Sequence, residues 1–319
     1  MLIRALTAFL VSVFLFAPAH EAGAAEPHRV VATTSMLADA VRVVGGDAVE
    51  VTALMGPGVD PHAYRQTRSD IVAMTKAELV IWHGLYLEAQ LEEFMERLAK
   101  SQSVVALGEA VPKDLLRAHD EYKGRYDPHI WMNPVLWRYV VDAAAETLSA
   151  QFPEAAEQFH ANADAYKQEL DRLTAYAGER LATVPETSRV LITAHDAFNY
   201  FGAAYGFDVV GIQGISTESE AGLRRIETLV DRLVSDNVQA VFVESSVSER
   251  NIRALIEGAA ARGHKVSVGG ELFSDAMGRD GTYEGTYLGM IDHNVTLITR
   301  ALGGKAPTDG RLGRLGGGA

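Results

Sequence analysis

Short apolar runs rich in β-branched residues recur along the chain and alternate with segments of helical periodicity. Four runs lie in the first half and four in the second, at 30–32, 49–54, 79–82, 104–107, 190–193, 209–212, 240–243 and 266–268. The segments between them place apolar residues three or four positions apart, as at Ile226, Leu229, Val230 and Leu233. Such alternation is typical of parallel sheets with helices on both faces. We therefore predict an α/β protein of two lobes, each with a four-stranded parallel sheet flanked by helices.

A long amphipathic segment separates the two halves. Its apolar residues are spaced by three or four, at Phe159, Ala163, Tyr166, Leu170, Leu173, Ala177 and Leu181. Pro153 opens the segment and Pro185 stops it. Thirty helical residues would span roughly 45 Å, enough to run along both lobes. A coiled-coil helix is the alternative, but the chain has no second heptad run to serve as its partner, so a single linking helix is favoured.

The amino terminus has the pattern of a cleavable secretory signal. Arg4 precedes an apolar run at 6–17, and small residues at 22–25 precede Glu26. The apolar run is short for a membrane anchor, so we expect an exported, periplasmic protein. The glycine-rich end of the chain predicts a flexible tail. The predicted division is a signal at 1–25, an N-terminal lobe at 26–152, a linking helix at 153–184, a C-terminal lobe at 185–302 and a tail at 303–319.

Composition narrows the possible functions. The 319 residues include no cysteine, which excludes disulfides, thiolate metal sites and a lipid-modified cysteine, so we expect a protein that is not anchored to the membrane. The formal net charge is −13, which makes nucleic acid an improbable partner.

The tripeptide Asp-Pro-His occurs twice, ending at His62 and at His129, and a third histidine, His195, follows the apolar run at 190–193. Proline restricts its own backbone and that of the residue before it, so each tripeptide presents its imidazole from a stiff turn. Ligands of open α/β sheets collect beyond the carboxyl ends of strands, which is where His195 is expected. Asp275, after the run at 266–268, is the best candidate for a fourth ligand, although a Ser-Asp pair is also a common helix cap.

Three neutral imidazoles and one carboxylate form a plausible shell for Zn²⁺ and a possible one for Mn²⁺. Two ligands from each lobe would make the ion a staple between the lobes. Candidates for orienting the imidazoles through their second nitrogen are Asp196, Glu218 and Glu244. The remaining histidines are predicted to be structural or on the surface, namely His83, His119, His160, His264 and His293, and His28, next to the cleavage site, is expected to be mobile.

Five longer motifs carry a resemblance to a known family: DPHAY at 60–64, DPHIWMNP at 127–134, TAHDAFNYF at 193–201, GISTE at 214–218 and GGELFSD at 269–275. Over essentially the whole mature chain, the sequence resembles the solute-binding proteins of manganese and zinc ABC importers, the metal receptors with a rigid linking helix (cluster A-I). The resemblance implies metal ligands at His62, His129, His195 and Asp275. It also implies a monomer that delivers its ion to a membrane permease with a cytoplasmic ATPase, with only small lobe movements.

Two departures bear on the identity of the ion. Many manganese-selective members have Glu where this chain has His195, and many zinc-selective members have a histidine-rich loop that this chain lacks. A nitrogen-rich site favours Zn²⁺ over Mn²⁺, although metal availability can reverse occupancy. Two other hypotheses remain: a secreted zinc hydrolase, for which no His-Glu-x-x-His motif is present, and a cell-adhesion protein that keeps the receptor fold.

Overall fold

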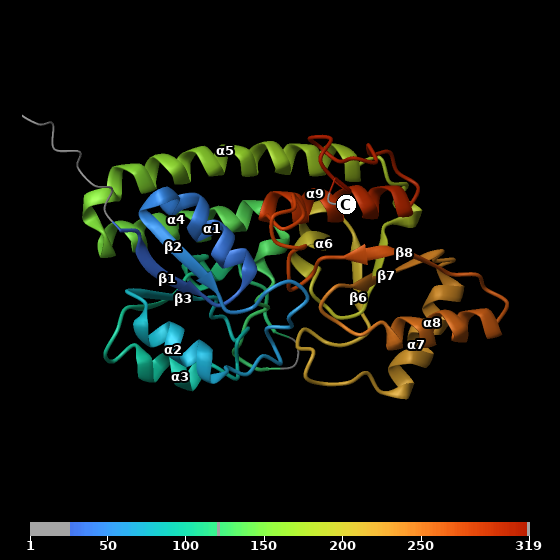
Figure 1. Cartoon of the computed structure of the whole chain (residues 1–319). Coiled ribbons are helices and arrows are strands. Elements are labelled where there is room, and N and C mark those ends of the chain that lie inside the picture. The colour runs from blue at the N-terminus through green and yellow to red at the C-terminus, as the bar shows by residue number, and fades with distance from the viewer. Residues whose placement is uncertain (1–25, 120–121, 318–319) are drawn as a thin grey trace, which may run out of the picture.

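The computed structural model describes residues 26–119 and 122–317, so the predicted signal at 1–25 lies outside the described residues. Two α/β lobes lie side by side beneath one long helix (Figure 1). The predicted fold class, two lobes with parallel sheets and a long connecting helix, is confirmed. Within the described ranges, no helix has the length and apolar character needed to cross a membrane.

The N-terminal lobe contains one parallel sheet in the order β2-β1-β3-β4. Its strands are β1 (His28–Ala32), β2 (Val49–Ala53), β3 (Leu79–Trp82) and β4 (Val104–Ala106). Its helices are α1 (Ser35–Gly45), α2 (Arg68–Lys76), α3 (Glu92–Leu98) and α4 (Pro134–Gln151). β1, in the middle of the sheet, is almost entirely apolar after Arg29, which suits a strand covered by helices on both faces.

The C-terminal lobe differs from the predicted single four-stranded sheet. Its strands pair in two separate parallel ladders, β5 (Val190–Thr193) with β6 (Asp208–Gly211) and β7 (Ala240–Glu244) with β8 (Ser267–Leu272). β5 and β7 lie next to each other without forming a ladder. Just beyond β5, the amide of His195 donates to the side chain of Glu244, at 2.9 Å, instead of to a backbone carbonyl of β7. The helices of this lobe are α6 (Asn199–Tyr205), α7 (Leu223–Ser235), α8 (Arg250–Ala261) and α9 (Tyr287–Ala301).

β8 runs through two glycines at which the sequence reading ended the strand. A β-carbon on Gly269 would lie 2.7 Å from the ring of Phe242 in β7, so only glycine permits this approach of the two strands. Gly270 has φ of +139°, which favours glycine, and it follows the register shift of the β7–β8 ladder, in which Gly269 is the extra residue. The two glycines therefore allow β8 to stay paired with β7 up to Leu272, three residues before Asp275.

The long helix α5 (Ala156–Leu181) has 26 residues and is about 39 Å long. It begins after a 3-10 turn at Pro153–Ala155 and ends before Pro185, inside the range predicted from the sequence. All seven apolar residues of its predicted face are buried. They pack into a core shared with α1, α4 and α9, which ties both lobes to the same helix.

The C-terminal segment departs from the flexible tail expected at 303–319. Its described part, 303–317, forms turns against α9. The amide of Arg311 lies 2.9 Å from both carboxylate oxygens of Asp292, a buried residue of α9, and the amide of Gly316 donates to Glu284 at 2.8 Å. Glycine content suggested disorder, but a buried carboxylate needs donors and this segment supplies them.

His28 is also placed differently from the prediction. It is the first residue of β1 and not part of a mobile end. Its Nδ1 lies 3.0 Å from Glu78, its Nε2 lies 2.7 Å from Glu154, and its ring stacks on Phe152 at a centroid distance of 3.9 Å. His28 thus connects the start of the sheet to the start of the long helix.

Candidate metal centre

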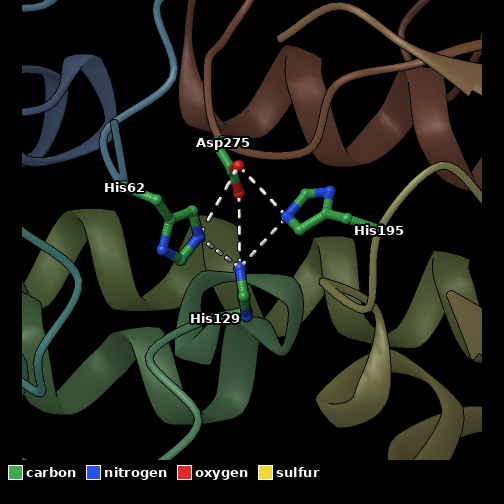
Figure 2. Close-up of side chains that lie close together, drawn as sticks. All are labelled: His62, His129, His195 and Asp275. Atoms are coloured by element: carbon green, nitrogen blue, oxygen red, sulfur yellow. Dashed lines mark hydrogen bonds and ion pairs between the residues drawn. The ribbon is translucent and has the colours of Figure 1, made fainter. Parts of the chain in front are cut away.

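Three histidines and one aspartate from four different loops point toward one another between the lobes (Figure 2). His62 lies in the loop between β2 and α2, and His129 directly precedes the 3-10 turn Ile130–Met132. His195 follows β5, and Asp275 follows β8. All four are buried: His62 is 3% exposed, Asp275 is 2% exposed and the other two are fully covered. The structure thus brings together all four residues that the sequence predicted as ligands.

The donor atoms converge at ligand-to-ligand distances. One atom of each residue lies within 4.8 Å of the others. His129 Nε2 is 3.3 Å from both His62 Nε2 and His195 Nε2, and Asp275 Oδ2 is 3.1 Å from His195 Nε2 and 3.8 Å from His62 Nε2. Ligands bound at about 2.0–2.1 Å to a tetrahedral ion would be roughly 3.3 Å apart. The four side chains therefore have the composition and spacing to hold one ion such as Zn²⁺.

The Asp275 carboxylate is poorly satisfied by the protein itself. Both of its oxygens are buried and, among the described residues, neither accepts a hydrogen bond of good geometry, although His195 and His129 approach them to 3.1 and 3.4 Å. A buried carboxylate without donors is costly, and a cation is the partner that such groups usually have. This orphaned carboxylate supports a metal ion at the centre of the group.

Two of the imidazoles are oriented by carboxylates through their far nitrogen. His129 Nδ1 donates to Asp127 Oδ1 at 2.7 Å, and His195 Nδ1 donates to Glu244 Oε2 at 2.5 Å. Both carboxylates are buried. Each contact leaves Nε2 free for an ion and fixes the ring plane, which is the usual outer arrangement of histidine ligands. Glu244 was among the sequence candidates, whereas Asp127 was missed although it stands in the Asp-Pro-His motif itself.

The surroundings shift the pKa values of His62 and His129 in opposite directions. Burial lowers the pKa of His62 to about 3, so this imidazole is neutral and free to bind a cation. Burial also opposes protonation of His129, but the Asp127 and Asp275 carboxylates outweigh it and raise its pKa to about 9. For Asp275, burial opposes ionisation, but His195 and His129 hold its pKa well below the usual range. The site is thus rich in negative charge, which protons on imidazoles or a divalent ion can neutralise.

A family model described as the periplasmic component A of a zinc-uptake complex matches residues 30–301. The chain belongs to this family. It is 48% identical over 274 residues to the manganese-binding lipoprotein MntA of Bacillus subtilis (strain 168), covering 86% of this chain and 89% of that protein. It is 44% identical over 273 residues to the zinc-binding protein TroA of Treponema pallidum, covering 86% and 88%. The solved structure of the periplasmic zinc-binding protein TroA matches with a TM-score of 0.84 at 43% identity, over 86% of this chain and 99% of the TroA chain.

The family resemblance inferred from the sequence motifs is therefore confirmed. Its members are metal-binding receptors of uptake systems, and relatives of similar identity are named for different ions, manganese in one case and zinc in the other. The site of this chain, with three imidazoles and one carboxylate, has donors suited to either ion.

The other sequence candidates lie outside the donor group. Asp196 has a buried oxygen without a hydrogen bond, and Glu218 accepts a hydrogen bond from Gln90 of the N-terminal lobe at 2.6 Å. Of the histidines predicted to be structural, His83 is fully buried and its Nε2 donates to the carbonyl of Pro128 at 2.8 Å. His83 thus fixes the second Asp-Pro-His turn by a hydrogen bond to its proline carbonyl, a role that no local sequence signal indicated.

Proposed function

We propose that this protein captures one divalent transition-metal ion, zinc or manganese, and delivers it to an ABC permease powered by a cytoplasmic ATPase. The observation that carries the proposal is the buried convergence of His62, His129, His195 and Asp275. We take these four as the ligands. The lobes at 26–152 and 185–302 each contribute two of them, and the linking helix at 153–184 keeps the lobes at a fixed spacing.

Which ion the site binds depends on the nitrogen and oxygen atoms that act as ligands and on the availability of each metal. Three nitrogen ligands favour Zn²⁺ by intrinsic affinity, and Mn²⁺ prefers more oxygen ligands. Asp275 can offer both of its oxygens, which would help Mn²⁺. We propose tighter binding of zinc and leave both ions as cargo, since relatives are named for each.

We propose that the protein is a receptor and not an enzyme. Catalytic zinc usually keeps three protein ligands and one open position for water, whereas four converging side chains fill a tetrahedral shell. The hydrolase hypothesis would need metal-dependent hydrolysis that is lost with His195→Ala. The adhesion hypothesis would need surface binding that does not depend on the metal ligands.

The proposed place of action is the periplasm, after removal of 1–25. The sequence has no cysteine that could carry a lipid, whereas the Bacillus subtilis relative is named a lipoprotein. We propose a free monomer that meets its permease by diffusion. Fractionation of cells that express the full chain tests this, because the proposal requires release of the protein with the periplasmic contents.

Metal titration of the purified, metal-stripped mature protein tests the function. Zn²⁺ and Mn²⁺ are added in competition with a chelator, and bound ion is counted per chain. His195→Ala removes a ligand, and His160→Ala removes an exposed histidine of α5 as the matched control. We expect one ion per chain in the wild type and in His160→Ala, and no stoichiometric binding in His195→Ala.

The same variants can be tested for delivery in cells that lack the chromosomal gene. We expect the wild type and His160→Ala to restore accumulation of zinc or manganese, and His195→Ala to fail. A wild-type protein that binds no ion at stoichiometric level would overturn the proposed function. Tight binding without any effect on accumulation would separate metal capture from delivery.

A further inference from the structure

The two Asp-Pro-His turns use their aspartates in the same way at the backbone. Asp60 Oδ1 accepts the amide of His62 at 2.8 Å, and Asp127 Oδ1 accepts the amide of His129 at 3.0 Å. Each carboxylate thereby closes a short turn that sets the position of the histidine two residues later. Up to this point the two turns are equivalent.

The turns differ at the imidazole. Asp127 also binds the ring of its histidine, at Nδ1, and Glu244 does the same for His195. Among the residues that the structure describes, no protein group makes a hydrogen bond to His62 Nδ1. The ring of His62 is thus the one imidazole of the site that no carboxylate orients through Nδ1. Outside its own loop it contacts the rings of His129 and His195.

The second oxygen of Asp60 reaches the other lobe. Asp60 Oδ2 accepts a hydrogen bond from Thr217 Oγ1 at 2.5 Å, so one carboxylate joins the His62 turn to the loop after β6. Both residues are only half-buried, whereas all four donors are buried. Asp60 and Thr217 also line a hollow of about 190 Å³, whose other charged lining residues are Glu220 and Arg250.

The other three donors, or the loop that carries them, have an additional buried hydrogen bond. His129 and His195 have their buried carboxylates. The Asp275 loop is tied to the N-terminal lobe by the indole nitrogen of Trp131, which donates to the carbonyl of Ser274 at 2.7 Å. Withdrawing His129 or His195 would break a buried hydrogen bond within its own lobe, and withdrawing Asp275 would disturb a buried hydrogen bond between the lobes. Withdrawing His62 breaks no bond to an orienting carboxylate.

We propose that the Asp60–Thr217 hydrogen bond is a latch that holds His62 on the ion, and that His62 is the ligand that the ion gains last and loses first. The inference rests on the proposed function and adds the route of exchange, through the hollow lined by Asp60 and Thr217. A movement limited to one loop is compatible with a rigid helix α5 that restricts separation of the lobes. Asp60 and Thr217 are positioning residues in this scheme and do not touch the ion.

Stopped-flow release of Zn²⁺ into an excess of chelator tests the latch. Thr217→Val removes the donor at nearly constant size, and Thr217→Ser keeps the hydroxyl. Thr228→Val is the matched control, because Thr228 is exposed on α7 and bonds only within its own helix. A hydrogen bond to a charged group is substantial, so we expect release from Thr217→Val to be on the order of tenfold faster. Thr217→Ser and Thr228→Val should release at the wild-type rate.

A second measurement separates the latch from a general loss of stability. Hydrogen exchange of the metal-free proteins should become faster around the His62 amide in Thr217→Val and stay unchanged around His129. Release within twofold of the wild type, or equal acceleration in Thr217→Val and Thr228→Val, would overturn the latch while leaving stoichiometric binding, and hence the proposed function, intact. A wild type that binds no zinc would overturn both.

Discussion

The two lobes meet in two regions of opposite character. Near α5 lies the interlobe base, formed by Asp39, Trp131, Ser274 and Tyr287 with their contacts. Trp131 donates to Ser274, the hydroxyl of Tyr287 donates to the Trp131 carbonyl at 2.8 Å, and the amide of Tyr287 donates to Asp39 at 3.1 Å. Away from α5 lies the interlobe mouth, where Asp60 meets Thr217 and Gln90 meets Glu218.

The difference is one of burial. Trp131 and Tyr287 are fully buried, whereas Gln90 and Glu218 are exposed and their hydrogen bond competes with water. Buried hydrogen bonds and close packing are expensive to break, and exposed ones contribute little to stability. We infer that the base fixes how the lobes stand relative to each other, and that the mouth is free to open and close around the site.

The largest effect is expected from Trp131→Ala at the base. It removes a fully buried indole and its bond to Ser274, so we expect the free energy of unfolding to fall by about 3–5 kcal/mol. Denaturant unfolding of the metal-free protein measures the loss. Trp131→Phe is the control, which keeps an aromatic ring and should recover most of the stability. A loss below about 1 kcal/mol would show that the base does not hold the lobes.

A smaller effect is expected from Tyr287→Phe. The variant keeps the ring that stacks on Trp137 at 5.1 Å but leaves the buried carbonyl of Trp131 without this donor. We expect a loss of about 1–2 kcal/mol in the same unfolding experiment. Tyr139→Phe removes a hydroxyl from an exposed tyrosine of α4 and should change nothing measurable. Equal losses in the two variants would mean that burial at the base has no special weight.

At the mouth, Gln90→Ala should lower the free energy of unfolding by less than about 0.5 kcal/mol, because both partners of the Gln90–Glu218 hydrogen bond are exposed. Gln102→Ala is a comparison within one lobe, since Gln102 donates to two backbone carbonyls of the N-terminal lobe. We expect it to lower the free energy of unfolding more than Gln90→Ala does. Urea unfolding of the two variants side by side checks the order. A larger loss for Gln90→Ala would make the mouth a structural contact and not a movable one.

Much of the long helix and of the site could be predicted from the sequence because the signals are local. The spacing of apolar residues indicated α5 and its buried face, and the repeated Asp-Pro-His turns indicated His62 and His129. Asp275 could be predicted because it follows a strand of the second lobe, at the carboxyl edge of the sheet where ligands usually bind.

The contacts of the mouth and the support of the second Asp-Pro-His turn by His83 could not be predicted, since they join residues far apart in the chain. Asp60 and Thr217 are 157 positions apart, and His83 and Pro128 are 45 apart. The hydrogen bond from the His195 amide to the Glu244 side chain, which links the two ladders of the second lobe, joins residues 49 positions apart. No periodicity or motif encodes such contacts, because they arise only when the lobes are packed together.

A third region, remote from both base and mouth, is expected to give the smallest effect and one that depends on pH. His28 bridges Glu78 and Glu154 at the edge of the N-terminal lobe. The hydrogen bond with Glu78 raises the pKa of His28 above its ordinary value of 6.5, against a lowering by burial, and the bond with Glu154 raises it further. We expect His28→Gln to destabilise the protein slightly in mild acid, with no change in zinc affinity, as measured by thermal unfolding across a pH series.

The sign of this pH dependence follows from linkage. Because the pKa of His28 is higher in the folded protein than in the unfolded chain, its contribution is complete below 6.5 and is lost as pH rises through the raised pKa. The pKa of Glu78 is lowered, by the Arg29 amide and then by His28, so its contribution is present above its ordinary 4.5 and lost as pH falls. The difference between wild type and His28→Gln should therefore peak between these two values and shrink on either side. In a Glu78→Gln background the peak should be reduced, and a difference that grows with rising pH would contradict the bridge.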